Sequence, residues 1–281
     1  MSRTVTVALD GSPESAAAAG WAAREAVLHT APLRLVHVRE RPPSGADRDA
    51  RMLTEAAAEL ARRHPGLDVA AEQVAGRPAQ ALSALARRSP VLVLGSRGRG
   101  RTAGYLLGSV AAAVVARAEQ PVVLVRAGAD PAAEHLPDAP GRPAGTGPYR
   151  DVVLGLNQPE RPCEALLAYA FDAAERRAAT LRVVHGSAPD PAGAADDLAA
   201  GADATCAAAL RPWREKYPDV PVVEETVVGS PGPHLADASR DACLVVVGRR
   251  TRHPAVGPQI GPVLDTLLRH AEAPVAVVPH E

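Results

Sequence analysis

Short runs rich in Val and Leu alternate along the chain with longer Ala-rich stretches. Brief apolar runs between turn residues are typical of buried strands, and the longer stretches favour helices. In the N-terminal half this pattern predicts strands over 5–9, 33–38, 68–74, 91–94 and 121–125, and helices over 14–29, 49–64, 78–88 and 109–118. In the C-terminal half it predicts strands over 151–156, 181–185, 220–227, 243–247 and 274–278. Five strands joined by helical crossovers indicate a parallel, doubly wound sheet in each half.

The two halves also repeat one another in sequence. LRLVHV at 33–38 returns 148 residues later as LRVVHG, and AEQPVVLV at 118–125 returns 153 residues later as AEAPVAVV. Between the halves, residues 127–149 are rich in Pro, Gly and Ala and have no apolar periodicity, which is typical of a linker. We therefore expect one domain over 1–126, a linker over 127–149 and a second domain over 150–281.

A glycine-rich loop follows the fourth predicted strand. It reads GSRGRGRTAGYLLGS and places Gly95, Gly98, Gly108 and Ser109 in the order G-x2-G-x9-G-S. Glycine permits a positive φ and close approach of the backbone to a ligand, and N–H groups at a helix start favour phosphate. We expect the first two glycines to shape the turn at the end of the strand, and the Gly-Ser pair to offer donors at the start of the next helix. Positive charge in the same loop comes from Arg97, Arg99 and Arg101.

A carboxylate follows the first predicted strand, in the sequence Leu9-Asp10-Gly11-Ser12-Pro13. Open α/β sheets bind ligands at the carboxyl ends of strands where the strand order reverses, here between the first and fourth strands. Asp10 would face the glycine loop there and could meet a ribose hydroxyl or a phosphate-bound cation. Asp-Gly-Ser-Pro is also a good turn and N-cap sequence, so a structural role stays open.

Together, VALDGSP, LRLVHV and the G-x2-G-x9-G-S loop before AEQPVVLV resemble the universal stress protein family. The resemblance implies two tandem Rossmann-like α/β domains, each with strand order 3-2-1-4-5. It also implies ATP as the ligand, with Mg as an accompanying ion, pairing of the two domains as a pseudo-dimer through the fifth strands, and a homodimer as a further option. It assigns Asp10 to ribose or metal, Val38 to adenine, Gly95 and Gly98 to ribose and phosphate, and Gly108, Ser109 and Val110 to phosphate.

The second half keeps this spacing but changes the chemistry. At the positions of Asp10, Val38, Gly98 and Ser109 it has Asn157, Gly186, Thr251 and Pro262. Asn carries no charge, a β-branched Thr resists positive φ, and Pro has neither N–H nor hydroxyl for a phosphate. Asp265 near the same helix start would repel an anion. We therefore expect one nucleotide, in the first domain, although another anion could still meet Arg249, Arg250, Arg252 and His253.

Composition excludes several partners. The 31 basic and 32 acidic side chains give a net charge of -1, so we do not expect a basic surface that binds nucleic acid. No apolar run approaches the roughly 20 residues of a membrane helix. The three cysteines are widely spaced and match neither a disulfide framework nor a zinc-ligand pair, which favours the cytoplasm. His37 and His185 occupy matching strand positions without a Cys, His or carboxylate at metal spacing, so we expect hydrogen-bonded core histidines and no metal site.

These features favour an ATP-binding, stress-response regulatory protein that is not an enzyme. The chain has no Walker loop, no G-x-S-x-G elbow, no G-x-G-x-x-G in its first βα turn and no evident catalytic base near the loop. Two alternatives stay open: an enzyme using ATP for slow hydrolysis or nucleotidyl transfer, and a ligand-free scaffold with both clefts closed.

Overall fold

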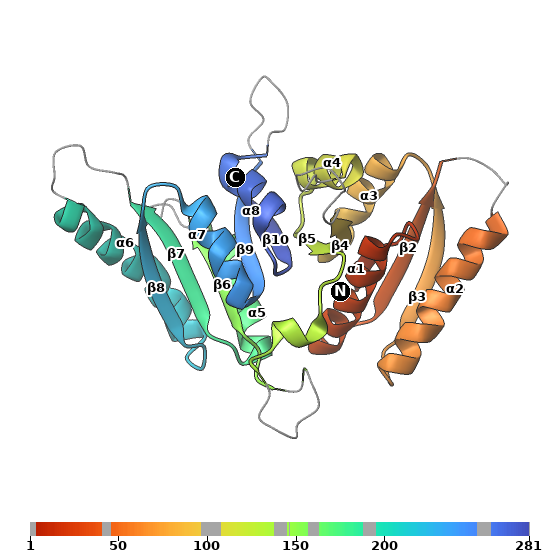
Figure 1. Ribbon diagram of the computed structural model, residues 1–281, viewed down its shortest axis with the longest axis horizontal. Coiled ribbons are helices and arrows are strands. Elements are labelled where there is room, and N and C mark those ends of the chain that lie inside the picture. Colours follow the sequence, from red (N-terminus) through yellow and green to blue (C-terminus); the bar gives the residue numbers. More distant parts are fainter. Residues whose placement is uncertain are drawn as a thin grey trace. The chain divides into compact units, whose positions relative to one another are not determined.

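The computed structural model describes residues 4–40, 46–96, 108–137, 145, 147–156, 163–187, 195–251 and 260–280. The described residues form two compact units, one up to Ala129 and one from Asp130 onward. Each unit contributes five parallel strands, with helices in the connections between them (Figure 1).

The first unit contains a five-stranded parallel sheet in the order β3-β2-β1-β4-β5. Its strands are β1 (Val5–Ala8), β2 (Leu33–Arg39), β3 (Val69–Ala75), β4 (Val91–Ser96) and β5 (Val122–Arg126). Its helices are α1 (Pro13–Leu28), α2 (Ala46–Arg63), α3 (Pro78–Ala86) and α4 (Ser109–Arg117). The predicted strand order is therefore confirmed in this unit.

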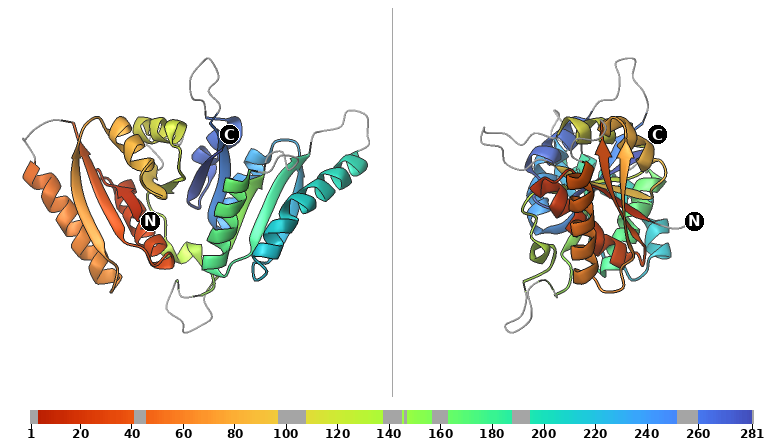
Figure 2. Two further views of the ribbon diagram at one scale, coloured as in Figure 1. Left: turned by 180° about the vertical axis from the view of Figure 1, so that it is seen from behind. Right: turned by 90° about the vertical axis from the view of Figure 1, so that its right-hand side faces the viewer.

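Helices of the first unit pack in pairs. Helix α1 contacts α2, and α3 contacts α4, as right-handed crossovers require when the strand order runs in two directions from β1. Alanines 18, 22, 23 and 26 of α1 are fully buried, so this helix lies close to β1 and β4. Helix α2 lies along β2 and β3 (Figure 2).

The second unit repeats this arrangement in the order β8-β7-β6-β9-β10, again with parallel pairs. Its strands are β6 (Asp151–Leu156), β7 (Leu181–Ser187), β8 (Val222–Val228), β9 (Ala242–Arg250) and β10 (Val275–His280). Its helices are α5 (Glu164–Arg177), α6 (Ala195–Lys216), α7 (Pro231–Ala238) and α8 (Pro262–His270), with a 3₁₀ turn η2 (Ser239–Asp241). Within the described ranges, no helix combines the length and hydropathy that crossing a bilayer requires.

Strand β9 runs furthest beyond the end that its sequence pattern predicts. The apolar run indicates an end near residue 247, but β9 continues to Arg250. The added residues Gly248, Arg249 and Arg250 pair with residues 278–280 of β10. Hydrogen bonding to a neighbouring strand extends β9 into a polar segment that hydrophobicity alone does not mark.

Part of the segment 127–149, predicted as a linker, has local structure in its described residues. A 3₁₀ helix, η1 (Pro131–Glu134), is capped by Asp130 and contacts β9. His135 then forms an antiparallel bridge with Tyr149, and its Nδ1 lies 2.7 Å from the carbonyl oxygen of Gly147. This part of the segment packs with the second unit.

Candidate functional site

The carboxyl ends of β1 and β4 lie side by side at one edge of the first sheet. Strand β1 pairs with β2 on one side and β4 on the other, so the strand order reverses between β1 and β4. This is the position at which open α/β sheets bind ligands. Asp10 follows β1, and Gly95 lies near the end of β4. The fold therefore brings these two predicted residues to the same edge.

Asp10 is held by the turn that starts α1. Its Oδ1 accepts hydrogen bonds from the Ser12 amide at 3.0 Å and the Ser12 hydroxyl at 2.5 Å. Gly11 between them has a φ of +81°, which glycine accepts without strain. Burial alone would raise the pKa of the Asp10 carboxyl, but the hydrogen bonds from Ser12 and Ser15 outweigh it and lower the pKa. Asp10 is therefore a carboxylate at neutral pH.

The same turn caps α1. The Ser12 hydroxyl accepts a hydrogen bond from the Ser15 amide at 3.1 Å, and Pro13 occupies the first helical turn. The Ser15 hydroxyl in turn accepts a hydrogen bond from the Asp10 amide at 3.3 Å. The structural role anticipated for Asp-Gly-Ser-Pro is thus present, and it holds the carboxylate at the strand end.

Gly95 does not shape a turn, contrary to the sequence interpretation. It lies inside β4 and pairs with Val125 of β5. A Cβ atom at Gly95 would lie 2.7 Å from the carbonyl carbon of Glu14 and 2.8 Å from the amide nitrogen of Ser15. The start of α1 packs directly on this strand, so only glycine leaves room for it. Gly98 lies outside the described residues.

Helix α4 begins at Ser109, as predicted, with Gly108 as its N-cap. Gly108 has φ −59° and ψ 144°, a conformation open to any residue, so its backbone does not require glycine. The first-turn N–H groups of a helix have no partner within the helix and suit an anion. Ser109 is exposed and Val110 half-buried at this end of α4.

Val38, the residue assigned to adenine, lies near the end of β2 and pairs with Val74 of β3. Beside it, the Nδ1 atom of His37 lies 2.7 Å from the carbonyl oxygen of Leu9, which precedes Asp10. A carbonyl only accepts, so Nδ1 is the donor in this bond. The Nε2 atom faces Asp49 Oδ2 at 3.4 Å. His37 is therefore a hydrogen-bonded histidine, as predicted, that ties β2 to the end of β1.

The corresponding edge of the second sheet is built differently. The Thr251 amide and hydroxyl both donate to the carbonyl oxygen of His280, at 2.6 and 3.0 Å. Helix α8 begins at Pro262, and Asp265 in its first turn pairs with Arg269 at 2.8 Å. Arg249, one of the residues considered for another anion, is 8% exposed, and burial lowers the pKa of its guanidinium. Several loop residues of both halves lie outside the described part: Arg97, Arg99, Arg101, Asn157, Arg252 and His253.

Gly186, which corresponds to Val38, lies in β7 in a tighter space. A Cβ atom there would meet the carbonyl oxygen of Gly229 at 3.3 Å and the Pro231 ring at 3.6 Å. The turn between β8 and α7 therefore lies against this strand end, where a Val side chain would be crowded.

The fold is that of a parallel, doubly wound α/β protein, and comparison with known proteins identifies the family. The model of the universal stress protein family matches residues 1–126 and 148–279. The chain therefore belongs to the universal stress protein family, with two such domains in tandem.

Relatives of similar length carry the same tandem. Universal stress protein Rv2005c of Mycobacterium tuberculosis is 33% identical, over 97% of this chain and 96% of the relative. Universal stress protein Rv1996 of the same organism is 31% identical, over 97% and 94%. A crystal structure of a universal stress protein from Archaeoglobus fulgidus shares the fold over the full length of both chains, with a TM-score of 0.73 and 16% identity.

Proposed function

We propose that this chain is a stress-response regulatory protein that binds one adenine nucleotide, ATP with Mg, in its first domain. The observation that carries the proposal is the edge formed by β1 and β4, where the Asp10 carboxylate lies at the position that the fold offers to a ligand. Membership of the universal stress protein family supports the same ligand class.

Each proposed contact has a physical basis in the described residues. Oδ1 of Asp10 is held by Ser12, so Oδ2 is the oxygen that would meet a ribose hydroxyl or the magnesium ion. The α4 start, with Gly108, Ser109 and Val110, would donate to phosphate. Gly95 would let the nucleotide and α1 approach the end of β4, while Gly98 would complete the phosphate loop and Val38 would border adenine.

A binding protein fits this edge better than an enzyme. The sequence has no evident catalytic base near the glycine loop, and positioning alone supports only slow phosphoryl chemistry. Slow ATP hydrolysis or nucleotidyl transfer is therefore the second candidate, and a ligand-free scaffold the third. Single-turnover hydrolysis of ATP far above the rate in buffer would favour the enzyme.

The decisive experiment uses the full chain. Nucleotide released on denaturing the purified protein is identified by mass spectrometry, and isothermal titration then measures affinity and stoichiometry with ATP, ADP, AMP and cyclic AMP. We expect one nucleotide per chain and roughly ten- to a hundredfold weaker binding in Ser109→Pro, with Pro262→Ser as the matched control. A stoichiometry near two would contradict an assignment to the first domain alone, and no binding of any of the four would favour the scaffold.

Domain pairing and cellular location are two further predictions. We expect the domains to pair through 121–125 and 274–278, a contact that cross-linking between cysteines introduced in these two segments would detect. Residence in the cytoplasm is tested by fractionation of cells that express the tagged chain.

A further inference from the structure

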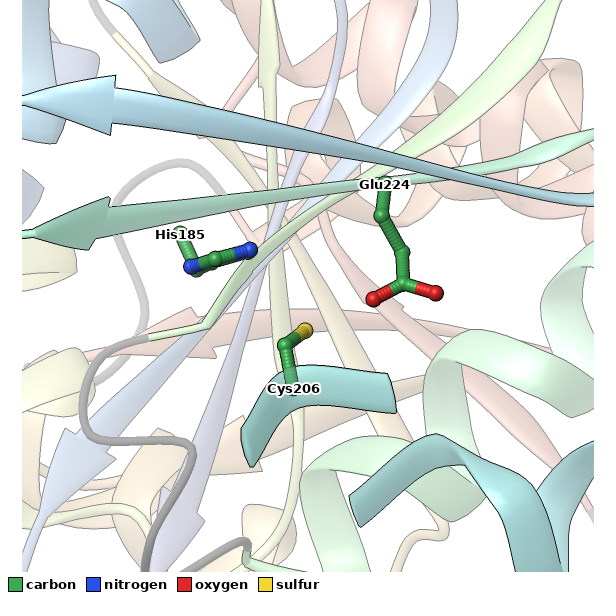
Figure 3. Close-up of side chains that lie close together, drawn as sticks. All are labelled: His185, Cys206 and Glu224. Carbon is green, nitrogen blue, oxygen red and sulfur yellow. The ribbon is translucent and has the colours of Figure 1, made fainter. Parts of the chain in front are cut away.

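Three side chains with different ligand atoms converge in the second unit. They are His185 of β7, Cys206 of α6 and Glu224 of β8. One nitrogen, sulfur or oxygen atom of each lies within 4.8 Å of the others. Figure 3 shows the three side chains directed toward one another from two strands and a helix.

The strand register explains why they meet. His185 pairs with Thr226 across β7 and β8, and Glu224 lies two residues before Thr226. Residues two apart in a strand point to the same face, so Glu224 reaches the face on which His185 lies. Helix α6 contacts β7 and β8 and brings Cys206 to the same place.

The surroundings shield these ligands from water. His185 and Cys206 are completely buried, and the Glu224 side chain is 21% exposed. Imidazole nitrogen, thiolate sulfur and carboxylate oxygen are the three ligand types that zinc takes in proteins. Zinc-to-ligand distances of about 2.0–2.3 Å place tetrahedral ligands about 3.3–3.7 Å apart, so small side-chain movements would bring this set to a common ion.

We propose that His185, Cys206 and Glu224 form a zinc site in the second domain, with a water molecule as the fourth ligand. A thiolate and a carboxylate balance the charge of Zn²⁺, and the imidazole binds as the neutral form. Binding releases the thiol proton of Cys206 to solvent, so affinity falls as pH falls.

Neighbouring residues orient two of the ligands. Glu224 Oε1 accepts a hydrogen bond from Arg214 Nη2 at 2.7 Å, which leaves Oε2 as the oxygen for the metal. The Thr226 hydroxyl lies 3.1 Å from His185 Nε2. Such outer partners are usual for metal ligands in proteins.

The first unit provides an internal reference for this site. His37 corresponds to His185, but the repeat places Leu53 and Ala71 where the second unit has Cys206 and Glu224. Leu53 is buried at 3% exposure, and Ala71 is exposed. The same fold therefore accommodates apolar residues at these two positions, and the ligand set belongs to the second unit alone.

Metal analysis of the full-length protein tests the proposal. After purification without chelator, we expect about one zinc per chain by inductively coupled plasma mass spectrometry. Replacement of zinc by Co²⁺ should give the charge-transfer absorption of a cobalt thiolate. Cys206→Leu and Glu224→Ala, which introduce the residues of the first unit, should lower zinc affinity at least tenfold, and Cys206→Leu should also remove the thiolate band.

Cys243→Ala is the matched control, because Cys243 is also buried but lies in β9 outside the cluster. It should keep both the zinc and the cobalt band. Glu224→Gln tests the carboxylate without a change in size, in case Cys206→Leu does not fold as judged by circular dichroism. Zinc content below one-tenth per chain after incubation with Zn²⁺ and desalting, or equal zinc in wild type and both cluster variants, would overturn the proposal. Nucleotide affinity measured on the same samples tests the first-domain proposal independently. We expect the zinc-site variants to bind nucleotide as the wild type does.

Discussion

The two units share a strand order but differ in what contacts the end of the fourth strand. In the first unit the start of α1 packs on Gly95 of β4, whereas in the second the amide and hydroxyl of Thr251, directly after β9, donate to the carbonyl oxygen of His280. The sheet cores of both units are built from buried Val and Leu, and such cores depend mainly on volume and pattern. The edges depend on individual donors and glycines. The comparison shows that one fold can be kept while the chemistry at its strand ends changes.

A second difference surrounds the shared histidine. His37 bonds to the Leu9 carbonyl beside the proposed nucleotide edge, whereas His185 lies in the buried cluster with Cys206 and Glu224. The same strand position therefore serves a strand-end contact in one unit and a candidate metal ligand in the other.

The largest effect that we expect separates the two helix starts. Ser109→Pro removes an N–H group and a hydroxyl from the start of α4. Loss of a charge-assisted donor to phosphate costs about 1.5–3 kcal/mol, which lowers nucleotide affinity roughly ten- to a hundredfold. Isothermal titration measures the change in nucleotide affinity. Pro262→Ser at the start of α8 should leave nucleotide affinity unchanged. An equal loss of nucleotide affinity in both variants would show that the two helix starts do not differ in phosphate binding.

Gly95→Ala should destabilise the first unit by about 1–3 kcal/mol, because its Cβ would lie 2.7 Å from the backbone of Glu14. Gly20→Ala is the control, because a Cβ there meets only Arg24 at 3.8 Å within α1. That change should stabilise by up to about 1 kcal/mol through helix propensity. Urea denaturation monitored by circular dichroism measures the free energy of unfolding of both variants. Changes of the same sign in the two variants would contradict the packing explanation.

Substitutions at the N-caps of α1 and α5 should have smaller effects on the free energy of unfolding. Ser12→Ala removes the cap of α1 and should cost about 1 kcal/mol of unfolding free energy. Cys163, the N-cap of α5, makes no side-chain cap hydrogen bond. Cys163→Ser should therefore stabilise the second unit by about 0.5 kcal/mol. Thermal denaturation of both variants measures these changes in stability. A stabilising effect of Ser12→Ala would refute the role of the Ser12 cap.

The smallest effect is the pH dependence from Asp10. Its pKa is lowered on folding, so its contribution is fully present above the unfolded value of about 3.9 and is lost as pH falls through the folded pKa. The side chain is exposed, so we expect under about 1 kcal/mol after solvent screening. Denaturant titrations of wild type and Asp10→Asn should therefore converge below pH 4. A difference that grows on acidification would mean that the pKa is raised instead.

Much of the fold followed from sequence alone. The apolar runs, the repeat and the crossovers predicted both parallel sheets, because buried parallel strands need continuous apolar segments whatever surrounds them. The strand order was predicted from the resemblance to the universal stress protein family. The turn at Asp-Gly-Ser-Pro and the helix start at Ser109 were also predictable, since capping depends on residues close together in the chain.

Only the tertiary structure decided the rest. Gly95 is required because α1 packs on β4, β9 is extended by its pairing with β10, and Cys206 and Glu224 meet His185 through the register of β7 and β8 and the placement of α6. Each of these contacts joins segments that are remote along the chain. Local spacing carries no information on such contacts, because they depend on how neighbouring strands align and where a helix crosses the sheet.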